Sequence, residues 1–276
     1  MRNGWAVCKR EFASFFHTPV GFVIIGTYAV ITGVVFWAMF YYYHLYSISP
    51  STYGFKGVPD FEETFLSPFL VYCGSIIALI GPLVTMRLLA EEKSRGTIEL
   101  LLTHPLRDRE IIFGKYAAAL GILMVMMAVV VVYMLIVFYF VLIEPSVLVF
   151  GVFSIALMGA AFLSLGLFVS SLCRNQVTAG AISFGAFFIF YLVGLISEEL
   201  PETSPIPEGW PGGVQALLGW LYNAVRVFSQ ELPLDAHAKE MALGIVQPHD
   251  IAYYVLFAAF FLFLTFRVLD SPKWRT

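Results

Sequence analysis

Several apolar runs of about 20 residues dominate this chain of 276 residues and restrict it to one kind of structure. Each run is long enough to cross a bilayer as a helix, and backbone polar groups inside hydrocarbon are satisfied only within helices or closed barrels. Charged residues make up only 13% of the chain, against about 25% of a soluble domain. The runs therefore predict an all-α polytopic membrane protein.

Charges, prolines and turn residues divide the chain, which we interpret as one transmembrane domain (1–276), into six spans. The spans are expected at 19–43, 65–90, 116–143, 147–172, 177–196 and 251–269. Gly81-Pro82 predicts a kink in the second span. Residues 1–18 separate apolar from charged side chains, which is typical of an amphipathic helix on the membrane surface.

The segment 197–250 interrupts this pattern because it is rich in proline and acidic residues. Within it, GGVQALLGWLYNAVRVF places apolar side chains on one helical face and is better suited to an interfacial or re-entrant helix than to a span. We expect a long external loop with this short helix before the sixth span. Glu198 and Glu199, at the outer end of the fifth span, are candidates for an external gate, and a solvated connection is the alternative.

Lys and Arg are distributed unequally between the two sides of the predicted bundle. Of the 16 Lys and Arg residues, only Lys56, Arg226 and Lys239 lie on one side. The others lie near the two termini, between the second and third spans, and in the turn at Arg174. Cytoplasmic loops carry an excess of Lys and Arg, so both termini and the central charged segment are expected in the cytoplasm.

Motifs of enzyme active sites are missing from the sequence. Gly114-Lys115 looks like the end of a Walker A motif, but Arg109 stands where the first glycine is needed and Tyr116 replaces Ser or Thr. The spans hold no ionisable side chain away from their ends, which argues against an ion-coupled carrier. We expect no catalytic residues and no cofactor in this chain.

The histidines and cysteines are also interpreted as ordinary residues. No two histidines are separated by three or four positions, so they are taken as isolated loop residues, and no metal site is predicted. The three cysteines are scattered and are taken as packing residues. These residues are His17, His44, His104, His237, His249, Cys8, Cys73 and Cys173.

A charged segment, residues 87–115, separates the second and third apolar runs and is expected to lie in water, because unpaired charges do not stay in hydrocarbon. Ile98, Leu101 and Leu102 recur in it at helical spacing and predict one apolar stripe. Thr97 is a suitable N-cap, and Pro105 ends the run. A short helix of this kind is suited to dock onto a soluble partner.

The same segment, RLLAEEKSRGTIELLLTHPLRDREIIFGKYAAAL, resembles the cytoplasmic signature of ABC-2 type permeases, the membrane subunits of ATP-driven exporters. The resemblance lies in Glu-Glu-Lys, Arg-Gly-Thr, Glu-Leu-Leu-Leu and a proline, followed by Gly-Lys at the third span. Within the family, the chain is most similar to the gliding-motility permeases of the GldF-like group. The resemblance implies the ABCG-like, type V fold, with a surface helix, six spans, and a cytoplasmic coupling helix between spans two and three.

The resemblance also implies partners and a location. It implies two ABC ATPase subunits that bind ATP and Mg, a second permease subunit, identical or related, and the bilayer of a bacterial inner (cytoplasmic) membrane, in which this chain is a multi-pass protein. An accessory envelope protein is a further expectation, and no nucleic acid is expected. The coupling helix, Thr97 to Thr103, would sit in a cleft of the ATPase. The residues implied in coupling are Glu91, Glu92, Lys93, Arg95, Gly96, Thr97, Ile98, Glu99, Leu101 and Leu102.

Two functional hypotheses stay open at this point. The first is the permease half of an ATP-driven exporter. The second is a membrane scaffold that transmits the force of an ATPase to a cell-envelope machine without moving a substrate. A passive channel is disfavoured because it has no need of a docking helix.

Overall fold

The computed structural model describes residues 2–96, 108–141, 143–201 and 212–270. In these ranges the regular structure is helical, and no strand occurs. Six helical segments are long and apolar enough to cross a membrane, as the sequence predicts. The all-α membrane fold is therefore confirmed.

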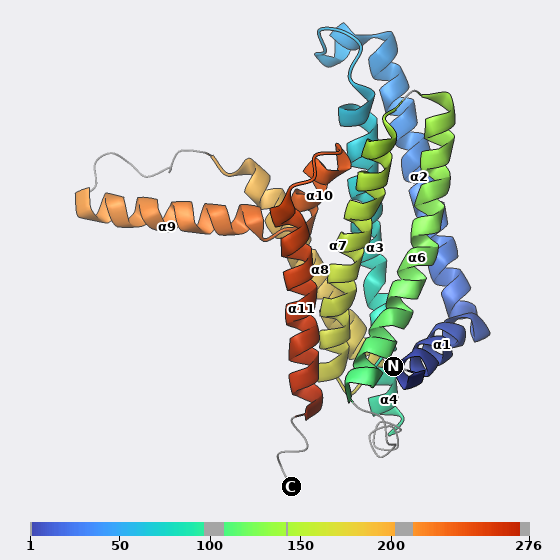
Figure 1. Cartoon of the computed structure of the whole chain (residues 1–276). Helices are drawn as coiled ribbons and strands as arrows, with labels where there is room; N and C mark the ends of the chain where they lie inside the picture. Colours follow the sequence, from blue (N-terminus) through green and yellow to red (C-terminus); the bar gives the residue numbers. More distant parts are fainter. Residues whose placement is uncertain (1, 97–107, 142, 202–211, 271–276) are drawn as a thin grey trace.

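The helices follow one another in the order shown in Figure 1. The first half contains the helices α1 (Arg2–His17), α2 (Pro19–Ile48), the 3-10 turn η1 (Pro50–Tyr53), the π-helical turn η2 (Glu62–Leu66), α3 (Ser67–Thr85) and α4 (Ala90–Ser94). The second half contains α6 (Asp108–Phe140), α7 (Pro145–Leu172), α8 (Gln176–Glu199), α9 (Gly212–Glu231), α10 (Leu234–Ala242) and α11 (Pro248–Asp270).

Local sequence explains several of these helix boundaries. α2 and α7 each begin with proline, whose fixed φ and missing N–H suit the first helical position. α8 begins after Asn175, whose side chain accepts a hydrogen bond from the Val177 N–H at 3.0 Å. These boundaries lie within two residues of the predicted ones.

Other boundaries differ from the prediction. The third span begins at Asp108 rather than at residue 116, because Asp108 and Glu110 stabilise the positive end of the first turn. In the second span, α3 continues through Pro82, and its helical pattern stops at Thr85 before α4 begins at Ala90. The region 197–250 holds α10 in addition to the predicted helix, which is α9.

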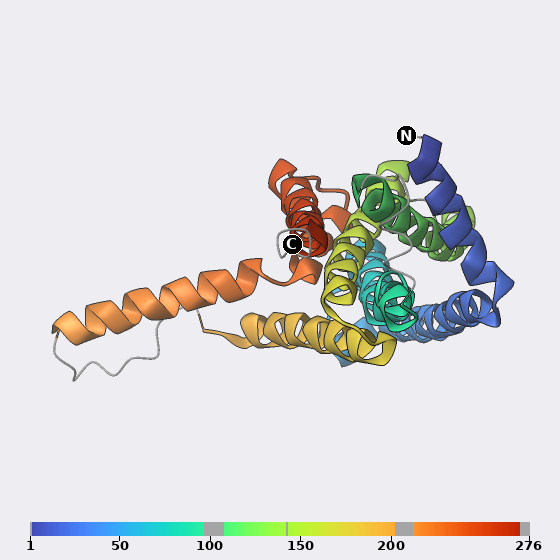
Figure 2. The same ribbon diagram turned by 90° about the horizontal axis from the view of Figure 1, so that it is seen from below.

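α3 and α7 form the centre of the bundle. α7 packs against α3, α6, α8, α10 and α11, and the second span is the most buried of the six. Viewed along the bundle, α2 and α6 lie on one side of α3 and α7, whereas α8 and α11 lie on the other sides (Figure 2). The outer helices carry many exposed apolar side chains, as expected of surfaces that face lipid.

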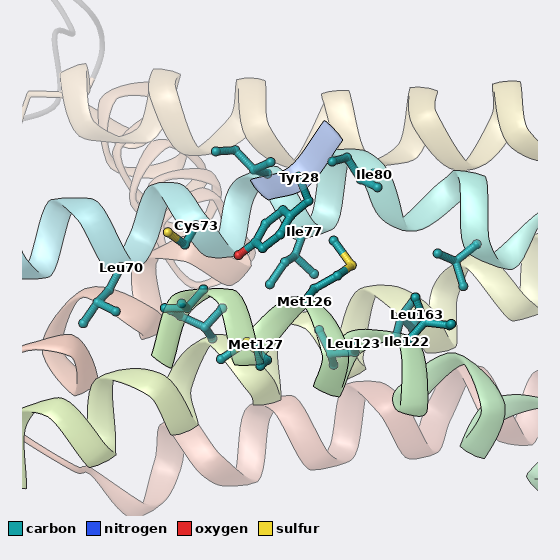
Figure 3. Packing of buried hydrophobic residues seen from close by; sticks show 14 of the residues in the cluster. Tyr28, Leu70, Cys73, Ile77, Ile80, Ile122, Leu123, Met126, Met127 and Leu163 are labelled. Atoms are coloured by element: carbon teal, nitrogen blue, oxygen red, sulfur yellow. The ribbon is translucent and has the colours of Figure 1, made fainter. Parts of the chain in front are cut away.

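The main apolar core lies where α2, α3, α6 and α7 meet. Figure 3 shows Ile77 of α3 facing Met126 of α6, with the ring of Tyr28 from α2 between these helices. Tyr28 is fully buried. Apolar side chains on these contact faces hold the helices in one arrangement by close packing.

Helix α9 does not join the bundle along its length. It extends away from the other helices, across the direction of the spans (Figures 1 and 2). Many of its apolar side chains are exposed, including Leu217, Trp220 and Phe228. This arrangement agrees with the predicted interfacial helix and does not make α9 a seventh span.

Candidate coupling site

The charged segment after the second span begins with the short helix α4, at the end of the molecule where α1 and the start of α6 also lie (Figure 1). Five of the residues implied in coupling fall in this described part: Glu91, Glu92, Lys93, Arg95 and Gly96. The predicted docking stripe lies outside the described residues, together with its flanks: Thr97, Ile98, Glu99, Leu101 and Leu102. The docking helix therefore stays a prediction.

α4 is attached to the C-terminal end of α7. Ser170 Oγ accepts hydrogen bonds from the backbone N–H groups of Leu89, at 3.2 Å, and Ala90, at 3.0 Å. The first N–H groups of a helix have no partner within it, and Leu89 at the N-cap has no polar side chain, so Ser170 supplies the missing acceptor. Lys93 Nζ in turn donates to the Ser171 carbonyl oxygen, where the negative end of the α7 dipole favours a cation.

A buried lysine connects α4 to two other helices. Lys115 in α6 is 1% exposed, and its Nζ lies 2.9 Å from Glu92 Oε1 and 3.2 Å from Glu11 Oε1 of α1. Arg10 Nη2 lies 2.7 Å from Glu11 and 3.5 Å from Glu92. We call these four residues the basal ion cluster. It joins the surface helix, the segment after the second span and the start of the third span.

The composition of the basal ion cluster accounts for its stability. Two cations face two carboxylates, so the cluster is neutral as a whole, although the Arg10 side chain is 59% exposed. Lys115 is the buried cation, and without its partners its charge would cost several kcal/mol at this depth. The hydrogen bond to Glu11, with the nearby charges of Glu11 and Glu92, raises the pKa of Arg10. The expectation that the whole segment 87–115 lies in water is wrong for Lys115, because α6 begins seven residues earlier and turns this side chain inward.

Glu91, by contrast, pairs at the surface. It lies 3.3 Å from Arg87 and 2.8 Å from Arg95, whose side chain is 70% exposed. Exposed pairs of this kind contribute little to stability. Gly96 follows the C-cap Arg95 with φ of 69°, the left-handed conformation in which glycine commonly ends a helix. Arg95 and Gly96 thus lie where a soluble partner can reach them.

Sequence reasoning did not find the basal ion cluster. It placed Lys115 at the edge of the third span, and it assigned Arg10 and Glu11 only to an amphipathic surface helix. The signal available was Lys115 itself, since a lysine beside a long apolar run needs a partner. The identity of that partner depends on residues up to 104 positions away.

The candidate gate lies near the other end of the bundle. Glu198 and Glu199 are the last residues of α8. Their side chains lie outside the described part of the structure, so the gate stays a prediction.

A cavity of about 460 Å³ lies close to that end, between η2 and α3, α8 and α10. Its lining combines aromatic and apolar side chains with charged ones: Glu63, Val71, Tyr72, Ser75, Tyr191, Leu195, Asp235 and Lys239. Pockets with mostly apolar walls and a few polar groups are typical of sites for small organic molecules. α10 contributes to this cavity, although its helix was not expected from the sequence.

The interpretation of the histidines as isolated loop residues is wrong for the four that the structure describes. His17 and His44 lie in α1 and α2, and His237 and His249 are neither in loops nor isolated. His237 lies on α10 and is 7% exposed, and its Nδ1 lies 2.8 Å from Asp250 Oδ1. His249 Nε2 lies 3.1 Å from the same oxygen. The rule of three- or four-residue spacing fails here because the two histidines come from different helices.

Comparisons with known proteins agree with this membrane fold. A family model described as ABC-2 family transporter protein matches residues 22–267. Two curated relatives are named probable multidrug ABC transporter permease YbhR, one from Escherichia coli (strain K12) and one from Escherichia coli O157:H7. Each is 30% identical over 183 residues, which is 66% of this chain and 46% of the relative. The chain thus spans about half the length of these relatives, and the narrower resemblance to the gliding-motility group is not supported.

Proposed function

Since the chain belongs to the ABC-2 family of transporter proteins, we propose that it is the permease half of an ATP-driven exporter whose ATP is hydrolysed by a separate ABC ATPase. The assembly would contain two ATPase subunits and a second permease, identical or related. Both termini and α4 would face the cytoplasm of a bacterial cell. The excess of Lys and Arg at that end of the molecule supports this orientation.

The observation that carries the coupling proposal is the attachment of α4. The basal ion cluster and Ser170 hold this short helix to α1, α6 and α7. Force applied to the segment after Gly96 would therefore move several helices together and not bend one loop. Two permeases connected in this way could alternate between inward and outward states when the ATPase subunits close.

The cavity between α3, α8 and α10 is our candidate for a substrate site. Tyr72 and Tyr191 offer aromatic faces, while Asp235 and Lys239 add charge. Such a lining suits a small amphipathic organic compound. The names of the E. coli relatives, which describe them as probable multidrug permeases, are consistent with this substrate class.

Co-purification tests the proposal most directly. The tagged chain would be extracted from native membranes in mild detergent, and proteins that come with it would be identified. We expect an ATPase with a Walker A motif. Leu101→Asp, which places a charge in the predicted docking stripe, should reduce its recovery at least tenfold, the effect of losing an interface hot spot of about 2 kcal/mol.

Val58→Asp is the matched control, because Val58 is 70% exposed and belongs to the connection between η1 and η2, which lies at the opposite end of the bundle from α4 (Figure 1). It should leave ATPase recovery unchanged. Absence of an ATPase in several detergents would contradict the proposal. If the ATPase is recovered but no amphipathic compound changes its rate, the scaffold hypothesis would replace the exporter.

A further inference from the structure

Two histidines and an aspartate meet where α10 approaches the first turn of α11 (Figure 1). His237 comes from α10, and His249 and Asp250 come from α11. The ligand atoms that the three side chains offer all lie within 4.8 Å of one another. We call these residues the His-His-Asp cluster. They take no part in the basal ion cluster or in the cavity.

His237 lies between two hydrogen-bond acceptors. Its Nε2 lies 3.1 Å from the Glu231 carbonyl oxygen, which can only accept, so Nε2 carries a hydrogen. The other ring nitrogen, Nδ1, lies 2.8 Å from Asp250 Oδ1, a second acceptor. A positive charge is therefore needed between Nδ1 and the carboxylate, and either a proton or a metal ion can supply it.

The Asp250 carboxylate also needs a positively charged partner. It is 2% exposed, and its Oδ2 is buried without a hydrogen-bond partner among the described residues. Leaving a buried carboxylate oxygen unsatisfied is costly. A proton shared by His237 and Asp250 Oδ1 would leave Oδ2 without a partner, whereas one divalent cation could bind the carboxylate and both ring nitrogens together.

We propose that His237 Nδ1, His249 Nε2 and the Asp250 carboxylate bind one late first-row divalent metal ion of the zinc class. Imidazole and carboxylate are suitable ligands for such ions. Zinc bonds of about 2.0–2.2 Å require ligand atoms roughly 3.3 Å apart in a tetrahedral site. The distances from Asp250 Oδ1 to the two histidine nitrogens, 2.8 Å and 3.1 Å, are already close to this value.

The surroundings of the cluster also fit a metal site. The Glu231 carbonyl oxygen fixes the tautomer of His237, as the outer partners of metal-binding histidines usually do. The ring of Tyr253 stacks on His237 with centroids 4.1 Å apart and holds its plane. The His249 side chain is 61% exposed, which leaves an entry path and room for a water molecule as the fourth ligand.

Metal titration of the purified chain tests this site without reference to transport. The full chain would carry a tag without histidine, be stripped with a chelator in detergent, and be titrated with Zn²⁺ in a calorimeter. We expect one Zn²⁺ per chain. His249→Ala should weaken its binding at least tenfold, and Asp250→Asn should weaken it further. Zn²⁺ should raise the unfolding temperature of the parent but not of His249→Ala.

His44→Ala is the matched control, since His44 is an exposed histidine outside the cluster, and it should bind Zn²⁺ like the parent. His249 is also exposed, so its removal tests binding without emptying the core. Co²⁺ in place of Zn²⁺ should give the visible absorption bands of a tetrahedral site, and His249→Ala should lose them. The proposal is overturned if the parent binds no stoichiometric Zn²⁺, or if His249→Ala binds it as tightly.

These outcomes do not depend on whether an ATPase co-purifies. A chain that binds Zn²⁺ but recovers no ATPase would retain the metal site and lose the proposed function. The reverse result would retain the exporter and leave the His-His-Asp cluster as a protonated histidine paired with aspartate.

Discussion

At the scale of single residues, the notable feature is a lysine buried where a long apolar helix begins. Lys115 is 1% exposed, yet its ammonium group contacts the carboxylates of Glu11 and Glu92. The desolvation of Lys115 is offset only while both partners stay in place. Lys115 therefore joins helices. Its resemblance to the end of a Walker A motif, in Gly114-Lys115, gives no indication of this role.

Replacing Lys115 by Met should lower the free energy of unfolding by about 3–5 kcal/mol, because Glu11 and Glu92 would keep their largely buried charges and lose the buried cation that they share. The measurement is SDS-driven unfolding of the purified chain. A second change, Glu92→Gln, should restore part of the loss, since it removes one of the unpaired charges.

Lys9→Met is the control for this experiment. Lys9 lies on α1 like Glu11, but it is exposed, so its loss should change the free energy of unfolding by no more than about 0.5 kcal/mol. Equal stability of Lys115→Met and the parent would show that the basal ion cluster does not hold the three helices together.

At the scale of helices, α7 can occupy the centre because it presents glycines where its neighbours come close. A Cβ atom on Gly166 would lie 2.3 Å from Thr85 Oγ1 of α3, and one on Gly159 would lie 2.7 Å from Leu123 of α6. Gly166 and Ser170 lie one turn apart on α7, a spacing of small residues that permits close contact between helices. Gly185 of α8 differs, because a Cβ atom there would meet nothing from its surroundings within 4 Å. It serves no close contact among the described residues.

Alanine substitutions at these two glycines should have opposite effects. Gly166→Ala should lower the free energy of unfolding by about 1–3 kcal/mol, because the methyl group would force α3 and α7 apart. Gly185→Ala should leave it unchanged or raise it by up to about 1 kcal/mol, since alanine favours the helix and meets no obstacle. SDS-driven unfolding measures both, and equal effects would contradict the packing described for α7.

At the scale of the whole molecule, the two ends of the bundle differ in kind. One end carries α1, α4 and the end of α11, and the other carries η1 and the turn between α6 and α7 (Figure 1). Most of the Lys and Arg residues in the described ranges belong to the first end. The expected result is insertion with that end in the cytoplasm, because cytoplasmic segments retain positive charge.

Cysteine labelling in intact cells tests this orientation. In a chain with Cys8, Cys73 and Cys173 replaced by Ala, Val58→Cys should react with a maleimide that cannot cross the membrane. Arg174→Cys should react only after the membrane is permeabilised. Both positions are exposed, so access depends on the side of the membrane. Labelling of Arg174→Cys in intact cells would contradict the orientation.

The local properties of the chain were sufficient to predict its class, its six spans and the existence of the helices α1 and α9. Hydropathy and helical periodicity can be read from consecutive residues alone. An apolar run of sufficient length forms a helix in the bilayer whatever the rest of the chain does. The spans that begin at Pro19 and Pro145 are placed within two residues at their first residue. The start of α6 is missed by eight residues because charged residues at a span boundary are compatible with either helix or loop.

Only the tertiary structure decided which distant residues meet. Lys115 reaches Glu11 across 104 positions, and His237 reaches Asp250 across 13 and between two helices. No regular spacing in the sequence connects the residues of either pair. A charged residue in an apolar context indicates only that a partner is needed, and helix packing determines which partner is within reach. The sequence therefore determined that this is a six-span membrane protein with one strongly basic side, and the packing of α4, α7 and α10 decided where its charged groups meet.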